Sequence, residues 1–399
     1  MAATARTRRV LVFNQYAKPL SEPGGTRHIE LFGRLDGWDY LIVTGDRDYY
    51  SRQRVEADQK HFKRVRVSDY EGNNHRRVLN WLTYCLGALA TAFRPGQVDV
   101  VYASSPHILT PVAGWLAARM RRARFVLEIR DLWPDSMVDL GHLRPGSLTH
   151  RALKALEVWL YRRADRIVIV AAGWHEYLAA LGIERAKVEW VSNGAEPADF
   201  DLRPDDCRPL RDRLPVHGKL FVYTGAHGPA NGLDALLDAA AELPDHTFAL
   251  IGDGIEKPRL VERATGEGLT NVHFLDMIPK RELAGIIGAA DVGIHVLADA
   301  AVFRHGASPN KLYDYLAAGL PVVTNCPGDP HDIVYETGAG MAVDSSDLVA
   351  GIRKITELDS SSLREMGRRG RRYIQENRSR TVMAGRLQRV LDSVLPARQ

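Results

Sequence analysis

Short β-branched apolar segments alternate with helical segments along most of the chain. The apolar segments are nearly continuous and rarely alternate with polar residues, which is typical of parallel strands covered on both faces. In the first half the predicted strands are 10–13, 40–43, 98–102, 124–129, 166–170 and 188–191. The predicted helices are 27–35, 78–93, 109–121, 148–163 and 174–181. This repetition predicts right-handed crossovers and a doubly wound α/β domain.

A segment rich in proline and aspartate, 193–218, interrupts the pattern and predicts a linker at 201–218. The strands predicted after it are 220–223, 248–251, 272–275, 292–296 and 321–323. The helices predicted after it are 233–242, 257–266, 281–288 and 310–318, and an arginine-rich helical tail at 361–395 breaks around 377–379. The expected fold class is α/β, with two Rossmann-like, doubly wound parallel-sheet domains, 1–200 and 219–377, facing across a cleft.

Composition narrows the class of protein. The 399 residues are 45% hydrophobic and 26% charged, as in ordinary soluble proteins, and a net charge of +4 is too small to predict nucleic-acid binding. Three distant cysteines, Cys85, Cys207 and Cys326, disfavour a zinc site or disulfide framework and fit a reducing cytosol. No secretory signal precedes the first predicted strand, and the longest uncharged stretch, 78–93, is shorter than the roughly 20 apolar residues of a spanning helix. We therefore expect a cytoplasmic protein that is soluble or at most peripheral at a membrane.

In open parallel sheets, ligands bind outside the carboxyl ends of strands, so the loops after strands are the candidate sites. Gly24 and Gly25 follow the first strand and open the first helix, where backbone can approach an anion closely. A plain strand-to-helix turn is the alternative. His227, in the loop after the strand 220–223, is a possible phosphate donor.

The turn after the strand 248–251 begins like a dinucleotide fingerprint, with Gly252 and Gly254. Lys257 stands where the third glycine belongs, and no acidic residue follows in the expected context, so a nicotinamide or flavin site is disfavoured. A glycine turn followed by lysine suits a phosphate, because backbone N–H groups and one mobile cation can bind it. The alternative is a tight turn with a solvated lysine.

The stretch 306–323 is the most informative part of the sequence. Ser308 is a good N-cap and Pro309 a good first helical residue. The helix start at Ser308 and Asn310 can therefore hold a diphosphate, and Asp314 can accept hydrogen bonds from vicinal ribose hydroxyls.

Charged residues also follow the strand 124–129. Arg130 could face an anion and Asp131 could orient or deprotonate a hydroxyl, or the two could form a structural ion pair with Trp133 packed below. Arginines 119, 121 and 122, near the apolar segment 78–93, leave docking on an anionic membrane surface open beside a solvated face.

These stretches resemble the nucleotide-sugar-dependent retaining glycosyltransferases of the GT-B fold, also called glycosyl transferases group 1. The nearest subgroup looks like the bacterial transferases for N-acetyl-fucosamine-type sugars. The matching stretches run in the expected order along nearly the whole chain and are 24–27, 128–136, 192–194, 225–234, 251–254 and 308–323. The specific ones are 308–323 and the Arg-Asp-Leu-Trp-Pro-Asp stretch 130–135.

The resemblance implies a donor bound mainly by the second domain and an acceptor bound mainly by the first. Lys257 would contact the diphosphate, Asp314 the ribose, and Gly25 would bring backbone to the phosphate side. The helix 378–399 would cross back to the first domain. Such enzymes need no metal or other cofactor, because cations and helix dipoles stabilise the leaving group. A donor phosphate oxygen helps to deprotonate the acceptor, and the reaction retains anomeric configuration.

The sequence departs from the family pattern in three ways. Gly306 stands where the first of two glutamates eight positions apart is frequent, and Asp314 replaces the second. The arginine and lysine of the second domain's first loop are replaced near His227 and Asn231, so the grip on phosphate would rest on Lys257, helped by Arg304 or His305. The frequent histidine of the catalytic loop corresponds to Arg130.

The sequence thus predicts a retaining glycosyltransferase that moves a sugar from a nucleoside-diphosphate donor, most simply UDP-linked, to a hydroxyl. The acceptor would be a glycoconjugate, a polysaccharide precursor or a natural product. Two alternatives remain open: a nucleotide-sugar 2-epimerase or hydrolase of the same fold, and a catalytically silent protein that binds nucleotide-sugars. The donor sugar, the acceptor and the oligomeric state do not follow from the sequence.

Overall fold

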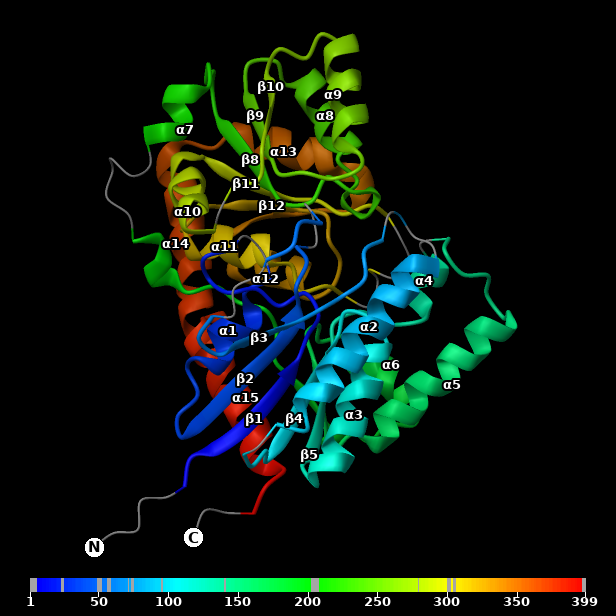
Figure 1. Cartoon of the computed structure of the whole chain (residues 1–399). Helices are drawn as coiled ribbons and strands as arrows, with labels where there is room; N and C mark the ends of the chain where they lie inside the picture. Colours follow the sequence, from blue (N-terminus) through cyan, green and yellow to red (C-terminus); the bar gives the residue numbers. More distant parts are fainter. Residues whose placement is uncertain are drawn as a thin grey trace, which may run out of the picture. The chain divides into compact units, whose positions relative to one another are not determined.

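The computed structural model describes residues 6–22, 25–48, 52–55, 59–70, 72, 75–94, 96–139, 141–201, 208–278, 280–299, 303 and 306–396. The chain folds into two compact units (Figure 1). Unit 1 consists of Met1–Val170, Trp174–Val191 and Met383–Gln399, and unit 2 of Ala171–Gly173 and Ser192–Val382.

Unit 1 is built on a seven-stranded parallel sheet in the order β3-β2-β1-β4-β5-β6-β7. Its strands are β1 (Arg8–Phe13), β2 (Trp38–Gly45), β3 (Phe62–Val65), β4 (Val100–Ser105), β5 (Arg124–Ile129), β6 (Arg166–Ile169) and β7 (Val188–Trp190). Its helices are α1 (Arg27–Phe32), α2 (His75–Thr91), α3 (Leu109–Arg121), α4 (Asp135–Asp139), α5 (Leu148–Arg163) and α6 (Trp174–Ala180). All residues of β4 are buried, as expected for a central parallel strand covered on both faces.

Unit 2 is built on a six-stranded parallel sheet in the order β10-β9-β8-β11-β12-β13. Its strands are β8 (Leu220–Thr224), β9 (Thr247–Ile251), β10 (Val272–Leu275), β11 (Val292–His295), β12 (Val322–Thr324) and β13 (Gly340–Ala342). Its helices are α7 (Arg208–Arg213), α8 (Asp234–Glu242), α9 (Lys257–Gly266), α10 (Lys280–Ala289), α11 (Asn310–Ala317), α12 (Asp329–Thr337), α13 (Leu348–Thr356) and α14 (Ser360–Tyr373).

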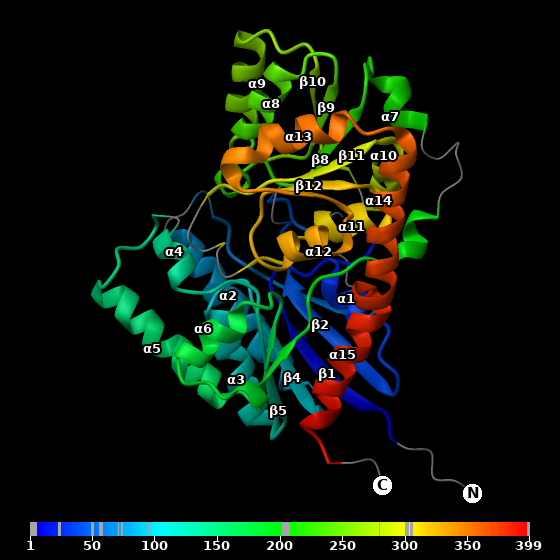
Figure 2. The same cartoon turned by 180° about the vertical axis from the view of Figure 1, so that it is seen from behind.

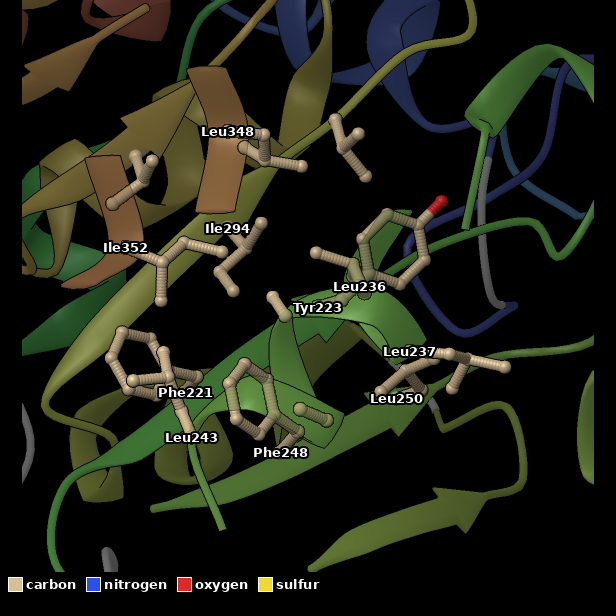
Figure 3. Packing of buried hydrophobic residues seen from close by; sticks show 14 of the residues in the cluster. Phe221, Tyr223, Leu236, Leu237, Leu243, Phe248, Leu250, Ile294, Leu348 and Ile352 are labelled. Atoms are coloured by element: carbon tan, nitrogen blue, oxygen red, sulfur yellow. The ribbon is translucent and has the colours of Figure 1, made fainter. Parts of the chain in front are cut away.

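The sheet of unit 2 buries a different helix layer on each face. On one face, side chains of α8 and α13 pack on the strands, with the rings of Phe221 and Phe248 stacked at a centroid distance of 5.0 Å (Figure 3). On the other face, Leu312 and Leu316 of α11 are fully buried against the sheet. Each such side chain contributes about 1.5–3 kcal/mol when it leaves water. This packing fixes the first turn of α11 beside the ends of the strands.

The C-terminal tail joins the two units covalently. A π-helical turn, Ile374–Arg378, separates α14 from α15 (Arg380–Ser393), at the place where the sequence predicts a break. Asp392 Oδ1 accepts hydrogen bonds from Arg8 Nη1 (2.7 Å) and Trp38 Nε1 (3.2 Å), so the last turns of α15 lie beside β1 and β2 (Figure 2).

The predicted fold class of two doubly wound parallel sheets is confirmed. Several predicted elements, among them α3, α5, α9, β5 and β10, have the bounds found in the structure. The pattern missed β3, β13, α4, α12 and α13. In the predicted linker, α7 is helical, while 202–207 lie outside the described residues. Within the described ranges, every helix is too short or too polar to span a lipid bilayer.

Candidate functional site

Two glycine-rich loops are joined at the carboxyl ends of β8 and β9 in unit 2. Gly225 N donates to Ile251 O (2.9 Å), His227 N to Asp253 O (2.8 Å), and Glu256 N to His227 O (3.0 Å). Gly252 has φ +151°, and a Cβ on it would lie 1.8 Å from Gly225 O. A side chain at position 252 would therefore separate the two loops. Gly254 is equally confined, because its Cβ would lie 2.3 Å from His227 O.

Lys257 begins α9 and supports this turn. Its Nζ donates to Gly252 O (3.0 Å), Leu275 O (3.1 Å) and Asp276 Oδ1 (2.9 Å). These contacts use all three ammonium protons and link the glycine turn to the end of β10. The predicted contact of Lys257 with a diphosphate stays a prediction, and it requires one of these bonds to be exchanged.

His227 lies beneath the joined loops. Its ring is fully buried, 5.9 Å from the ring of Tyr223 and 6.1 Å from that of Phe274. Neither ring nitrogen has a hydrogen-bond partner among the described residues. Burial, together with the positive charge of Lys257, lowers the pKa of His227 to about 4, so the ring is neutral at neutral pH.

The predicted residues of the 306–323 stretch lie at the start of α11. The expectation that Ser308 caps this helix is wrong: the N-cap is Pro309, and Ser308 Oγ accepts from the backbone N–H of Asn193 at 2.8 Å. The ring of Pro309 fixes the backbone angle φ at the start of the helix. Ser308 therefore lies one residue before the N-cap position. Asn310 is exposed, and Asp314 is buried one turn further along the helix. Arg304 lies outside the described residues, as does Gly24.

Lys311 is a residue of this edge to which the sequence reasoning gave no role. Its Nζ donates to Tyr223 Oη (2.7 Å) and Asn231 Oδ1 (3.3 Å) and lies 3.9 Å from the centroid of the Tyr223 ring. Burial lowers its pKa to about 7. The sequence could have indicated Lys311, because a lysine in the first turn of a helix is unfavourable beside the positive end of the helix dipole. A lysine at such a position is therefore a candidate for binding an anion.

In unit 1, Gly25 makes a tight turn and two predicted residues follow β5. Gly25 has φ +65°, and a Cβ on it would lie 2.6 Å from Tyr16 O. Arg130 is half-buried, with its backbone N–H donating to Ser105 Oγ at 3.2 Å, and Asp131 is exposed. No ion pair joins Arg130 to Asp131 among the contacts of the described residues. Trp133 lies edge-on to Trp81 at 5.5 Å.

The strongest polar cluster of unit 1 surrounds Glu128, which the sequence reasoning also left without a role. Glu128 is fully buried at the end of β5; Oε1 accepts from Arg27 Nε and Oε2 pairs with His28 Nε2, each at 2.8 Å. Burial alone would raise the pKa of Glu128, but Arg27 and His28 hold it well below its usual range. His28 Nδ1 lies 3.3 Å from Asn14 Nδ2. The negative charge of Glu128 at the end of β5 is thus balanced by the positive charge of Arg27 at the start of α1.

No group of three or more His, Cys, Asp or Glu side chains in the described part of the chain is arranged to hold a metal ion. The polar edge of unit 2 instead combines backbone N–H groups, lysines and one buried carboxylate. Such a combination suits an anion bearing hydroxyl groups.

Several solved structures have the same fold. Sucrose-phosphate synthase from Thermosynechococcus elongatus superposes with a TM-score of 0.78 at 18% identity, covering 97% of this chain and 100% of that one. HepE of Anabaena, solved in complex with UDP-glucose, gives 0.73 at 17% identity, covering 96% and 99%. The fold is therefore that of the GT-B proteins.

The sequence comparisons find similarity to glycosyl transferases in both parts of the chain. The description "Glycosyl transferase 4-like domain" matches residues 33–194 and "Glycosyl transferases group 1" matches 218–359. The first match lies mainly in unit 1 and the second in unit 2, so both parts of the chain are similar to glycosyl transferase domains. "Probable glycosyltransferase WbjE" of Pseudomonas aeruginosa is 26% identical over 264 residues, 65% of this chain and 66% of that protein. The chain spans less than two thirds of the length of the first curated relatives it matches.

The compensated charge at Glu128 gives a stability prediction. Glu128→Gln should lower the free energy of unfolding by about 3–5 kcal/mol at pH 7, because Arg27 is left buried without its anion. The lowered pKa means that the wild-type advantage is full above the ordinary value of 4.5 and declines as pH falls below it. Urea unfolding from pH 7 to pH 3 measures both effects. The exposed Glu189→Gln is the matched control; equal stabilities of the two variants would contradict the prediction.

Proposed function

We propose that the chain is a retaining glycosyltransferase that transfers a sugar from a UDP-linked donor, of N-acetyl-fucosamine type, to a hydroxyl of a glycoconjugate, polysaccharide precursor or natural product. The observation that carries the proposal is the edge of unit 2, where joined glycine loops, two lysines and Asp314 gather at the ends of parallel strands. The family matches and the UDP-glucose held by HepE support a nucleotide-sugar donor.

In this proposal unit 2 binds the donor. Asp314 accepts hydrogen bonds from the ribose hydroxyls, and the start of α11, at Ser308 and Asn310, faces the diphosphate. Gly252 and Gly254 hold the two loops together, and the backbone of the joined loops lies beside the phosphates. Lys257 exchanges a protein contact for a phosphate oxygen as negative charge builds on the leaving group.

Unit 1 binds the acceptor in the same proposal, with Arg130 and Asp131 orienting its hydroxyl and Gly25 presenting backbone to the phosphates. The bond between the anomeric carbon and the donor phosphate oxygen breaks, and a bond to the acceptor oxygen forms on the same face. The acceptor proton passes to a donor phosphate oxygen, so that UDP and the glycoside leave. No metal ion or cofactor takes part, and Lys257 and the helix start stabilise the departing diphosphate.

A donor panel tests the reaction. UDP-, GDP-, dTDP- and ADP-sugars are incubated with and without candidate acceptors, with excess EDTA in a parallel series, and products are identified by mass spectrometry and anomeric NMR. We expect acceptor-dependent transfer with retention that persists in EDTA. Isomerised or hydrolysed donor without transfer would favour the epimerase alternative, and binding without any product the silent alternative. Loss in EDTA with recovery on adding magnesium or manganese would contradict the metal-free mechanism.

The ribose contact gives a binding prediction. Asp314→Ala should weaken UDP binding by about 1.5–3 kcal/mol, the worth of a hydrogen bond to a charged group. Isothermal titration calorimetry measures the change, and Asp332→Ala, on the exposed side of α12, is the control. Unchanged affinity in a folded Asp314→Ala protein would remove this carboxylate from the site.

We also propose that unit 1 contacts an anionic membrane surface. Leucines 79, 82 and 86 on α2 and Met120 on the adjacent α3 are between 44% and 67% exposed. The exposed arginines around them are Arg76, Arg94, Arg119 and Arg122. Apolar side chains flanked by cations fit the headgroup region of anionic lipids.

Vesicle flotation tests this surface. The wild type should float with phosphatidylglycerol-containing vesicles and less with pure phosphatidylcholine, since each arginine near an anionic surface contributes about 1 kcal/mol. Leu82→Ser with Leu86→Ser should reduce binding at least about tenfold. Leu148→Ser, 83% exposed on α5, is the control. Equal binding of all three proteins, or none to anionic vesicles, would contradict the proposal.

A further inference from the structure

The ammonium of Lys311 has only neutral partners. It donates to the hydroxyl of Tyr223 and the amide oxygen of Asn231 and lies over the Tyr223 ring. Among the described residues no carboxylate forms an ion pair with it, whereas Lys257 has Asp276 and Lys154 has Asp135. A cation removed from water without an anion is costly unless a ligand supplies the charge.

The position of Lys311 is open to such a ligand. It stands in the first turn of α11 and is partly exposed, and a Cβ on Gly225 would lie 3.1 Å from its Nζ, so a glycine is needed beside the ammonium. Its partner Asn231 belongs to the loop after β8, residues 225–233, which contains no lysine or arginine. The positive charge that the loop after β8 lacks is therefore supplied from α11.

The two histidines and the thiol near Lys311 carry no charge at neutral pH. His227, from the loop after β8, and His295, from β11, both have a lowered pKa because of burial and are neutral. Burial raises the pKa of the Cys326 thiol, after β12, to about 12. The remaining charged groups are Asp314, one turn along the same helix, and Arg371 of α14, which bonds Ala317 O at the opposite end of α11.

We infer that Lys311 is the cation that grips the donor diphosphate from α11, and that it takes up a proton when the donor binds. The inference rests on the proposed function and names a residue of that site. Burial lowers the pKa of the amine to about 7 in the protein alone. A bound diphosphate, with two negative charges close by, raises that pKa again, because an opposite charge favours the protonated form.

This linkage can be measured without any variant. At pH 8 an amine with a pKa of about 7 is mostly neutral, so binding should take up about 0.9 proton per UDP. UDP itself is fully ionised there, since the second pKa of a phosphate monoester is about 6. Calorimetric titrations of UDP at pH 8 in buffers of different ionisation enthalpy give the proton number directly.

Three variants and one control, Lys354→Met, show which residue takes up the proton. Lys311→Met should bind UDP about 10- to 100-fold more weakly and without proton uptake. Lys311→Arg should recover part of the affinity, also without uptake, because arginine stays protonated. Lys257→Met should bind more weakly and keep the uptake. Lys354→Met, exposed on α13, should match the wild type in both respects.

The outcomes separate this inference from the proposed function. If neither UDP nor another nucleoside diphosphate binds the wild type, the donor site itself is refuted, and Lys311 loses its role with it. UDP binding with no proton uptake, or uptake that persists in Lys311→Met, refutes the inference about Lys311 alone. Loss of uptake in Lys257→Met but not in Lys311→Met transfers the role to Lys257.

Discussion

The close approach of Gly252 to the carbonyl of Gly225 is the constraint on which the polar edge of unit 2 depends. Only a residue without Cβ allows the loops after β8 and β9 to share their backbone hydrogen bonds. Those bonds bury His227 and direct Lys257 toward the carbonyls of the turn. The backbone of this edge is therefore held by the protein itself before any ligand arrives.

The two units treat buried charge in opposite ways. In unit 1, Glu128 pairs with Arg27 and His28, so its negative charge is balanced and the cluster contributes to the stability of the fold. In unit 2, Lys311 donates to a hydroxyl and an amide oxygen and lies over an aromatic ring, and none of these groups carries a full charge. The paired charge of Glu128 is stable without a ligand. The amine of Lys311, at the end of a parallel sheet and without a carboxylate partner, favours binding of an anion.

Much of the fold could be predicted from the sequence, because parallel strands buried on both faces form continuous apolar runs. β3 was missed because Lys63 and Arg64 interrupt its four residues, and β13 because a glycine begins it. For the site, glycines and the positions after strands were visible, as at Gly252. The partners of Glu128 and Lys311 were not, since Arg27 is 101 residues from Glu128 and Tyr223 is 88 residues from Lys311. Only tertiary structure brings such residues together.

The return of the C-terminal helix to unit 1 has a consequence for the order of biosynthesis. Arg8 and Asp392 are separated by 384 positions, and the whole of unit 2 is translated between them. A ribosome releases the first strands long before the helix that covers them exists. Unit 2 is nearly continuous in sequence and can close as it emerges, whereas unit 1 must wait with Trp38 uncovered until the last helix is released. The domain made first is thus the one completed last.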